Sequence, residues 1–230
     1  AQDNLDSLSD MQYIFIALPS QNVREVLYAC NLQQKGQEII IASKGIEIKS
    51  GLLLSEVIKE IVQTTKISIL SGPCFSDEVA QNLPTAVTFA SKRKKSFTTI
   101  STLIKNKNFR MYYSNDIIGC QIGGAVKNIY AIASGISMGL NLGENAKSAI
   151  ITRSFVEINR FAKFFGADKQ TIFGLSGLGD LILTCNSTKS RNTKFGQLIA
   201  TTSSPNFKEI LKSQEITEGY FTVAGVYKMA

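Results

Sequence analysis

The chain has 230 residues, of which 44% are apolar, 19% charged and 9% aromatic. A chain of this length and composition can bury a sizeable core, and it is too apolar and too lightly charged to be disordered. Its net charge of +7 favours anionic partners such as phosphorylated metabolites. The sequence contains no histidine, which excludes Ser-His-Asp triads, Cys-His dyads and histidine-ligated metal sites.

Four cysteines lie far apart in the sequence, at Cys30, Cys74, Cys120 and Cys185. This spacing forms no CxxC motif, so we predict no metal site and a reducing compartment. No signal peptide opens the chain, and we therefore expect a cytoplasmic protein. Residues 117–140 form a long apolar stretch, but its glycines and polar residues favour a buried helix of a soluble protein over a membrane span.

The first half of the chain alternates short apolar runs with helical patterns. We expect strands at 13–18, 38–42, 67–70, 85–90 and 109–113, and helices around 23–27, 53–63, from 75, and 97–104. This alternation predicts a parallel sheet with helices on both faces, whose chemistry lies beyond the carboxyl ends of the strands. Those ends lie at Pro19-Ser20, Ser43-Lys44 and Ser71-Gly72.

From about residue 116 the pattern changes to helices alone. Two apolar stripes repeat at helical spacing, one from Ile122 to Ile136 and one from Ile151 to Phe165. We therefore predict an α/β domain over residues 1–116, followed by an all-α substrate domain over residues 117–230.

Lys127 is the one charged residue between Ile117 and Leu140. The neighbouring Gly123 and Gly124 would let another backbone approach its helix. A buried lysine needs an anionic partner or its pKa falls, and a lysine with a lowered pKa can exchange a proton near neutrality. The alternative is a structural lysine that reaches solvent or pairs with a carboxylate.

Three further segments carry polar residues that suit an anionic ligand. Asp180 ends a glycine-rich turn that begins at Gly174, and it could pair with Lys127, bind a substrate hydroxyl or cap a helix. The run Ser190-Arg191-Asn192 could hold a phosphate at a helix start, although this segment alone favours ordinary capping by Ser or Asn, with Arg191 in solvent. Lys44 could screen an anion or lie in solvent. The basic run 92–95 has no interleaved aromatic residues, so we expect a solvated loop and no nucleic-acid binding.

Taken together, these residues resemble the bacterial-type NAD(P)-dependent glycerol-3-phosphate dehydrogenase family. The matching segments follow the family's order over nearly the whole chain: Ala17–Ser20, Ser43–Gly45, Ser71–Phe75 with Glu78–Ala80, Gly124–Asn128, Ile151–Arg153, Gly174–Asp180 with Thr184-Cys185, Ser190–Asn192 and Glu218–Tyr220. The resemblance implies an incomplete Rossmann-type sheet, with NAD or NADP as cofactor. It also implies reversible reduction of dihydroxyacetone phosphate to sn-glycerol 3-phosphate, which supplies phospholipid synthesis.

The resemblance also implies roles for individual residues. Lys127 would be the general acid/base at the C2 oxygen of the substrate. The implied substrate-binding residues are Lys44, Gly72, Cys74, Lys127, Asp180, Ser190, Arg191 and Asn192. The implied cofactor-binding residues are Lys44, Ser76, Arg191, Ile216 and Glu218. A homodimer is a further expectation, whereas the choice between NADH and NADPH is left open.

The sequence departs from the family's pattern in two respects. Cys74 stands where the family usually has Ser or Thr, and a thiol is a weaker hydrogen-bond partner than a hydroxyl. The opening strand, GxGxxG-type turn and helix of the dinucleotide fold are not in this sequence. We therefore expect an internal fragment of a longer protein, which on its own would bind NADH poorly and turn over slowly.

Two other classes of protein share some of these features. A β-hydroxyacid or ketopantoate dehydrogenase also combines a nucleotide-binding domain, a helical domain and a catalytic lysine. The phosphate-suited run Ser190–Asn192 argues against it, and competition by glycerol 3-phosphate would discriminate. The other class is a non-catalytic product of a split or decayed gene.

Overall fold

The computed structural model describes residues 5–30, 32, 36–62, 66–202 and 217–229. The strands are β1 (Tyr13–Ile16), β2 (Glu38–Ile41), β3 (Ile67–Ser71), β4 (Thr85–Ser91) and β5 (Phe109–Ser114). The helices among them are η1 (Leu5–Asp10), η2 (Ser20–Asn22), α1 (Val23–Ala29), α2 (Leu54–Ile61), α3 (Ser76–Ala80) and α4 (Lys94–Leu103). Each predicted strand and helix is present, with ends that differ by a few residues.

The five strands form one sheet in the order β1-β2-β3-β4-β5. The α/β class is confirmed, but the sheet is mostly rather than wholly parallel, because β4 runs antiparallel to β3 with Ser68 opposite Ser91. The link from β3 to β4 contains only the five-residue helix α3. A parallel connection must carry the chain back along the whole length of the strands, usually on a longer helix, so a helix of little more than one turn favours the antiparallel return.

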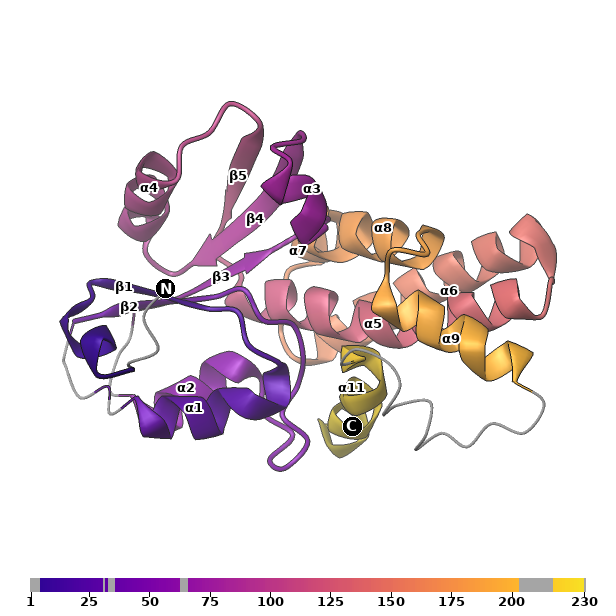
Figure 1. Ribbon diagram of the computed structural model, residues 1–230, viewed down its shortest axis with the longest axis horizontal. Helices are drawn as coiled ribbons and strands as arrows, with labels where there is room; N and C mark the ends of the chain where they lie inside the picture. Colours follow the sequence, from indigo (N-terminus) through magenta and orange to yellow (C-terminus); the bar gives the residue numbers. More distant parts are fainter. Residues whose placement is uncertain (1–4, 31, 33–35, 63–65, 203–216, 230) are drawn as a thin grey trace.

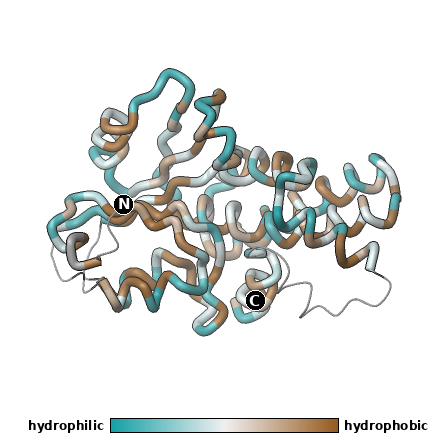
Figure 2. The backbone as a smooth tube through the Cα atoms, in the orientation of Figure 1, coloured by the Kyte–Doolittle hydropathy of each residue, from teal (hydrophilic) through white to brown (hydrophobic). Residues whose placement is uncertain are grey.

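Apolar side chains cover both faces of the sheet. On one face, Ile14, Ile39 and Ile69 pack against α1 and α2, which lie together below the sheet in Figure 1. On the other face, Ile40 and Phe89 pack against Ile100 of α4. Strands buried on both faces read as continuous apolar runs, which is why these strands are recognisable in the sequence; Figure 2 shows those runs in brown along the sheet.

The second half of the chain is helical. Its elements are α5 (Ile117–Gly139), α6 (Gly143–Phe164), α7 (Lys169–Phe173), the π-helical turn η3 (Leu175–Gly179), α8 (Asp180–Asn186), α9 (Arg191–Thr201) and α11 (Glu218–Met229). Helix α5 runs through the middle of this group and contacts α6, α8, α9 and α11, as well as β3 (Figure 1). The turn predicted at Gly174–Asp180 is therefore a helical turn that continues into α8.

Glycines allow α5 to pack this closely against its neighbours. A Cβ built on Gly135 would lie 2.1 Å from the carbonyl oxygen of Thr193, and one on Gly196 would lie 2.1 Å from that of Ile132. No side chain fits in either place, so α5 and α9 meet backbone to backbone. Within the described part of the chain, none of the helices combines the length and apolarity required to cross a membrane.

Candidate active site

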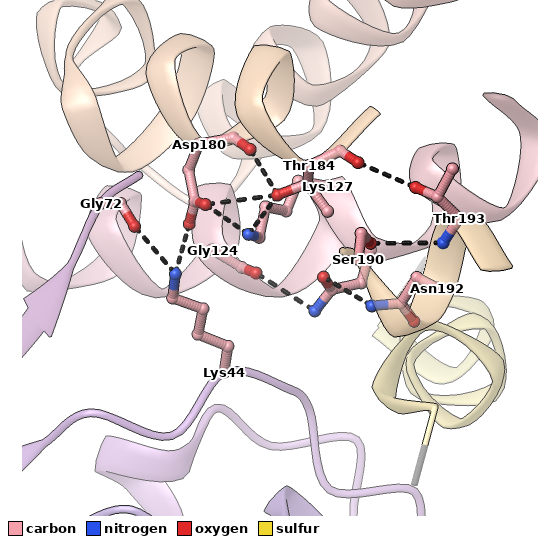
Figure 3. A network of polar contacts seen from close by, with 10 residues as sticks. Lys44, Gly72, Gly124, Lys127, Asp180, Thr184, Ser190, Asn192 and Thr193 are labelled. Carbon is pink, nitrogen blue, oxygen red and sulfur yellow. Dashed lines mark hydrogen bonds and ion pairs between the residues drawn. The ribbon is translucent and has the colours of Figure 1, made fainter. Parts of the chain in front are cut away.

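A lysine on the central helix lies at the centre of a buried polar cluster. Lys127 is 6% exposed, and its ammonium donates to the carboxylate of Asp180 and, over 2.6 Å, to Oγ1 of Thr184 (Figure 3). Thr184 in turn donates its hydroxyl proton to the main-chain oxygen of Asp180 over 2.6 Å. The expected pairing of Lys127 with Asp180 is confirmed.

Two glycines allow the close packing of η3 against α5 and α7 that brings Asp180 to this position. A Cβ on Gly123 of α5 would lie 2.6 Å from the carbonyl oxygen of Ser176, and one on Gly177 would lie 2.1 Å from that of Ile172. The turn η3 can therefore rest directly on α5 and deliver Asp180 at the start of α8. The alternative role of Asp180 as a helix N-cap is wrong, because Gly179 occupies that position and the carboxylate faces lysines.

Lys44 reaches the same carboxylate from the sheet. It follows β2, and its ammonium donates to Oδ2 of Asp180 over 2.5 Å and to the carbonyl oxygen of Gly72 over 3.0 Å. The alternative of a solvent-exposed lysine is wrong, since this side chain is only 20% exposed. Asp180 thus joins the carboxyl ends of the strands to the helical half (Figure 3). Cys74 is exposed beside this cluster and contributes to the electrostatics of both lysines.

The two lysines have opposite pKa shifts although they share one carboxylate. Burial lowers the pKa of Lys127 to about 8, the charge of Lys44 lowers it further, and Asp180 offsets only part of the fall. Burial also acts to lower the pKa of Lys44, but the charge and hydrogen bond of Asp180 outweigh it and the pKa is raised. Lys44 therefore stays protonated near neutrality, whereas Lys127 can gain or lose a proton there.

The start of α9 supplies a second group of polar side chains. The hydroxyl of Ser190 accepts from the backbone N–H of Thr193 over 3.2 Å, so Ser190 caps α9, as its alternative interpretation predicts. Asn192 is 8% exposed. It donates to Oδ1 of Asn128 over 3.0 Å and accepts from the backbone N–H of Gly219 over 2.8 Å. Asn192 therefore ties together α5, α9 and α11.

The remaining predicted residues lie around the carboxyl ends of the strands. Glu218, at the start of α11, accepts from the backbone N–H and the hydroxyl of Ser20 over 2.8 and 2.5 Å. Burial raises the pKa of Glu218, while the hydrogen bonds from Ser20 and the charge of Arg191 act in the opposite direction. Arg191 is exposed on the first turn of α9, and Ser76 is exposed at the start of α3. Ile216 lies outside the described residues.

Three residues of this cluster have no role in the sequence-based interpretation: Thr184, Asn128 and Ser20. Thr184 lies four residues after Asp180 on the same helix, so the spacing alone places both on one face. Asn128 directly follows Lys127. Ser20 could be found only as a polar residue at a strand end, because its partner Glu218 is 198 residues away.

Both halves of the chain match known protein families. Residues 1–97 match the family described as NAD-dependent glycerol-3-phosphate dehydrogenase N-terminus, and residues 116–230 match the corresponding C-terminus family. Among curated proteins, the glycerol-3-phosphate dehydrogenase [NAD(P)+] of Zymomonas mobilis is 43% identical over 231 residues, covering all of this chain and 67% of the relative. The corresponding protein of Thermotoga sp. strain RQ2 is 44% identical, covering all of this chain and 70% of the relative.

Solved structures give the same result. The crystal structure of glycerol-3-phosphate dehydrogenase from Coxiella burnetii superposes with a TM-score of 0.92 at 38% identity, covering 99% of this chain and 70% of that one. The structure from Dunaliella salina also has a TM-score of 0.92, at 21% identity, and supports the fold alone. With both family matches and relatives above 40% identity over its full length, the chain belongs to the NAD-dependent glycerol-3-phosphate dehydrogenase family.

Proposed function

We propose that the protein to which this chain belongs catalyses the reversible, NAD(P)-dependent reduction of dihydroxyacetone phosphate to sn-glycerol 3-phosphate. The observation that carries the proposal is the buried lysine with a pKa of about 8, held between a carboxylate and a hydroxyl beside the carboxyl ends of the strands. Membership of the family supports the substrate and the reaction.

Lys127 is the proton donor in this proposal. Reduction of a ketone develops negative charge on the carbonyl oxygen, and a positioned ammonium can neutralise that charge by transferring a proton. In the reverse direction the neutral amine accepts the proton of the alcohol. Asp180 and Thr184 fix the direction of the Lys127 side chain, and Lys44 remains a permanent cation that favours an anionic substrate.

The charges around the site support a phosphorylated substrate. Lys44 and Lys127 share the single carboxylate of Asp180, so the cluster keeps a net positive charge while Lys127 is protonated. Arg191 lies on the first turn of α9, next to the capping residue Ser190. A guanidinium fork at a helix start is suited to two oxygens of a phosphate. We assign the phosphate of the substrate to this helix start.

The residues at the carboxyl ends of the strands also suit part of a nicotinamide dinucleotide. A Cβ on Gly72 would lie 2.9 Å from Cα of Val87, and one on Gly45 would lie 2.4 Å from the side chain of Ser20. Neither position has room for a side chain, so the backbone at this edge of the sheet is closely packed. We propose that Lys44, Ser76, Arg191 and Glu218 hold the cofactor here. When bound, NAD(P) supplies or accepts the hydride.

Several finer points belong to the same proposal. Residues 1–116 and 117–230 act as a dinucleotide domain and a substrate domain, which agrees with the position of every described strand before residue 115. The alternative of a β-hydroxyacid enzyme is not favoured, because both halves match the glycerol-3-phosphate dehydrogenase families. A homodimer, a cytoplasmic location and the lack of nucleic-acid binding stay predictions.

The test is the kinetics of Lys127→Ala in the full-length protein, with NADH and NADPH each tried and dihydroxyacetone phosphate varied. Loss of a general acid typically lowers the rate about 10²–10⁴-fold, so kcat should fall by that factor while KM changes far less. Lys147→Ala is the matched control, because Lys147 is also a buried lysine in an ion pair, with Glu144 on α6. Full activity of Lys127→Ala would refute the assignment.

A further inference from the structure

Lys189 joins the two halves of the chain at the surface. It lies in the short turn between α8 and α9, and its ammonium donates to Oδ2 of Asp77 over 3.2 Å and to Oε1 of Glu78 over 2.7 Å. Both acids lie in the first turn of α3, which Figure 1 shows beside α8. The same ammonium lies 5.8 Å from the centre of the ring of Phe75, the N-cap residue of α3. One lysine therefore contacts three residues of a single short helix and its cap.

The turn that carries Lys189 is itself held in place. The backbone N–H of Lys189 donates to the hydroxyl of Ser187 over 3.1 Å, and the N–H of Ser190 donates to the carbonyl oxygen of Ser187 over 3.1 Å. Ser190 then caps α9 through the N–H of Thr193. A pre-formed turn loses less conformational entropy when it makes a contact, so the backbone of Lys189 is a fixed anchor for the segment that its side chain touches.

Helix α3 is held only weakly by packing. It has five residues, and none of them is buried. A helix of this length is unstable by itself in water, because its few hydrogen bonds do not offset the entropy lost when the backbone is fixed. A segment with few buried contacts also opens more easily than the core around it. Contacts from outside the helix, such as the ion pairs of Lys189, therefore have a strong influence on where α3 lies.

This contact lies between the residues assigned to the two ligands. Ser76, which belongs to the proposed cofactor set, directly precedes Asp77 on α3. Ser190 and Arg191, at the helix start assigned to the substrate phosphate, directly follow Lys189. The ion pairs thus connect the segment proposed to hold the cofactor with the segment proposed to hold the phosphate. A change in the spacing of these segments would alter both binding sites.

The charges at this contact do not suit direct attraction of a phosphate. One lysine between two carboxylates leaves a net negative charge, and two of the three N–H bonds of the Lys189 ammonium are already used. The hydrogen bonds of Glu78 and Asp77 raise the pKa of Lys189, and the hydrogen bond from Lys189 lowers the pKa of Asp77. The pair of Lys189 and Asp77 therefore stays charged through the neutral range, as a lasting link between α3 and α9 requires.

We propose that Lys189 is a positioning residue for the reaction. Through Asp77 and Glu78 it holds α3 against the start of α9, and so it sets the spacing between the cofactor side and the substrate side of the site. This role rests on the proposed function, because both ligands are those assigned there. Loss of the contact should weaken the binding of both ligands, while proton transfer by Lys127 stays unchanged.

The first measurement is amide hydrogen exchange of the full-length protein without ligands, followed by mass spectrometry. In Lys189→Met, peptides that cover residues 76–80 should exchange about threefold to tenfold faster, as expected for loss of two exposed ion pairs and a cation–π contact. Lys189→Arg should stay within about twofold of the wild type, because a guanidinium can bridge carboxylates and stack on a ring. The matched control is Lys194→Met, since Lys194 is an exposed lysine of α9 without an ion pair in the described part of the chain. Equal exchange in Lys189→Met and this control would overturn the proposal.

Ligand binding and kinetics then test the effect on the site. In Lys189→Met, the Kd of NADH and the KM of dihydroxyacetone phosphate should each rise about threefold to tenfold, with kcat within about twofold. Asp77→Asn/Glu78→Gln should act in the same direction, and the triple variant should be no weaker than Lys189→Met, because all three variants break one contact. If Lys189 attracted the phosphate directly, removal of the two acids would lower KM; that opposite sign, or an unchanged Kd and KM, would overturn the proposal. Lack of activity in the wild type would refute the proposed function, whereas the exchange rates would still decide whether Lys189 holds α3.

Discussion

Asp180→Asn tests the electrostatic account of the site most directly. The substitution keeps the shape of the side chain but removes the negative charge that lies between the two lysines. Burial and the charge of Lys44 would then lower the pKa of Lys127 without the opposing charge of Asp180. Loss of an opposite charge at this range changes a pKa by about 1–3, so the pKa of Lys127 should fall from about 8 to between about 5 and 7.

The expected rates follow from the protonation of Lys127. Reduction of the ketone requires the ammonium form, so its rate is lost as the pH rises through the pKa of Lys127. At pH 7 the protonated fraction should fall from about 0.9 to between about 0.5 and 0.01, which lowers the reduction rate about twofold to ninetyfold. Oxidation of glycerol 3-phosphate requires the neutral amine, so its pH profile should move to lower pH by the same amount.

The assay is the pH profile of kcat/KM in both directions for the full-length protein. Asp116→Asn provides the control, because this buried aspartate caps α5 through the N–H of Gly119 and has no contact with the lysines in the described structure. The control should lose stability but keep both profiles. Profiles of Asp180→Asn that match the wild type in position would refute the reasoning, whatever the loss in absolute rate.

Three other predictions concern substrate binding and stability. Arg191→Ala should raise KM for dihydroxyacetone phosphate about tenfold or more with a smaller change in kcat, as steady-state kinetics can measure; an unchanged KM would remove Arg191 from the phosphate site. The Arg24 ion pair lowers the pKa of Glu47, so this carboxylate stabilises the fold above its ordinary pKa and loses that contribution as the pH falls through its lowered value. Urea denaturation of Glu47→Gln at neutral pH should show a loss of about 1.5–3 kcal/mol, against less than about 1 kcal/mol for Glu60→Gln, an exposed partner of the same arginine; equal losses would contradict this. Gly196→Ala should cost about 1–3 kcal/mol of unfolding free energy, because its Cβ would overlap the carbonyl oxygen of Ile132; a neutral result in thermal unfolding would show that α5 and α9 can separate.

Local patterns in the sequence predict where the elements lie but not how all of them pair. Strands buried on both faces and helices with one apolar stripe can be recognised from the composition and periodicity of the sequence. The direction of β4 does not, since an antiparallel and a parallel strand with two buried faces have the same pattern. The sequence also does not show where α4 begins, because lysines such as Lys94 and Lys95 are normally unfavourable at the start of a helix.

The candidate site is predictable in its residues but not in its contacts. Lys127 stands out as a single charge in an apolar helix, and Asp180 stands out as an acid after glycines. That Lys44 reaches the same carboxylate depends on how the sheet packs against the helical half of the chain. Lys44 and Asp180 lie 136 residues apart in the sequence, so no local pattern shows this contact. Thr184 is an intermediate case, because helical spacing places it beside Asp180 but only the packing of α8 on α5 places it beside Lys127.

The two lysines differ in their pKa values because their surroundings differ. Asp180 offers one oxygen to each, but Lys127 is nearly sealed by its own helix bundle, whereas Lys44 is 20% exposed at the edge of the sheet and gains a carbonyl contact from Gly72. Burial is the largest effect on the pKa of both lysines, but Asp180 outweighs it only at Lys44, and the charge of Lys44 adds to the fall at Lys127. A single carboxylate thus produces one lysine that can exchange a proton near neutrality and one that stays charged. In the proposed reaction these are the two requirements: a proton donor for the developing alkoxide, and a fixed cation for an anionic substrate.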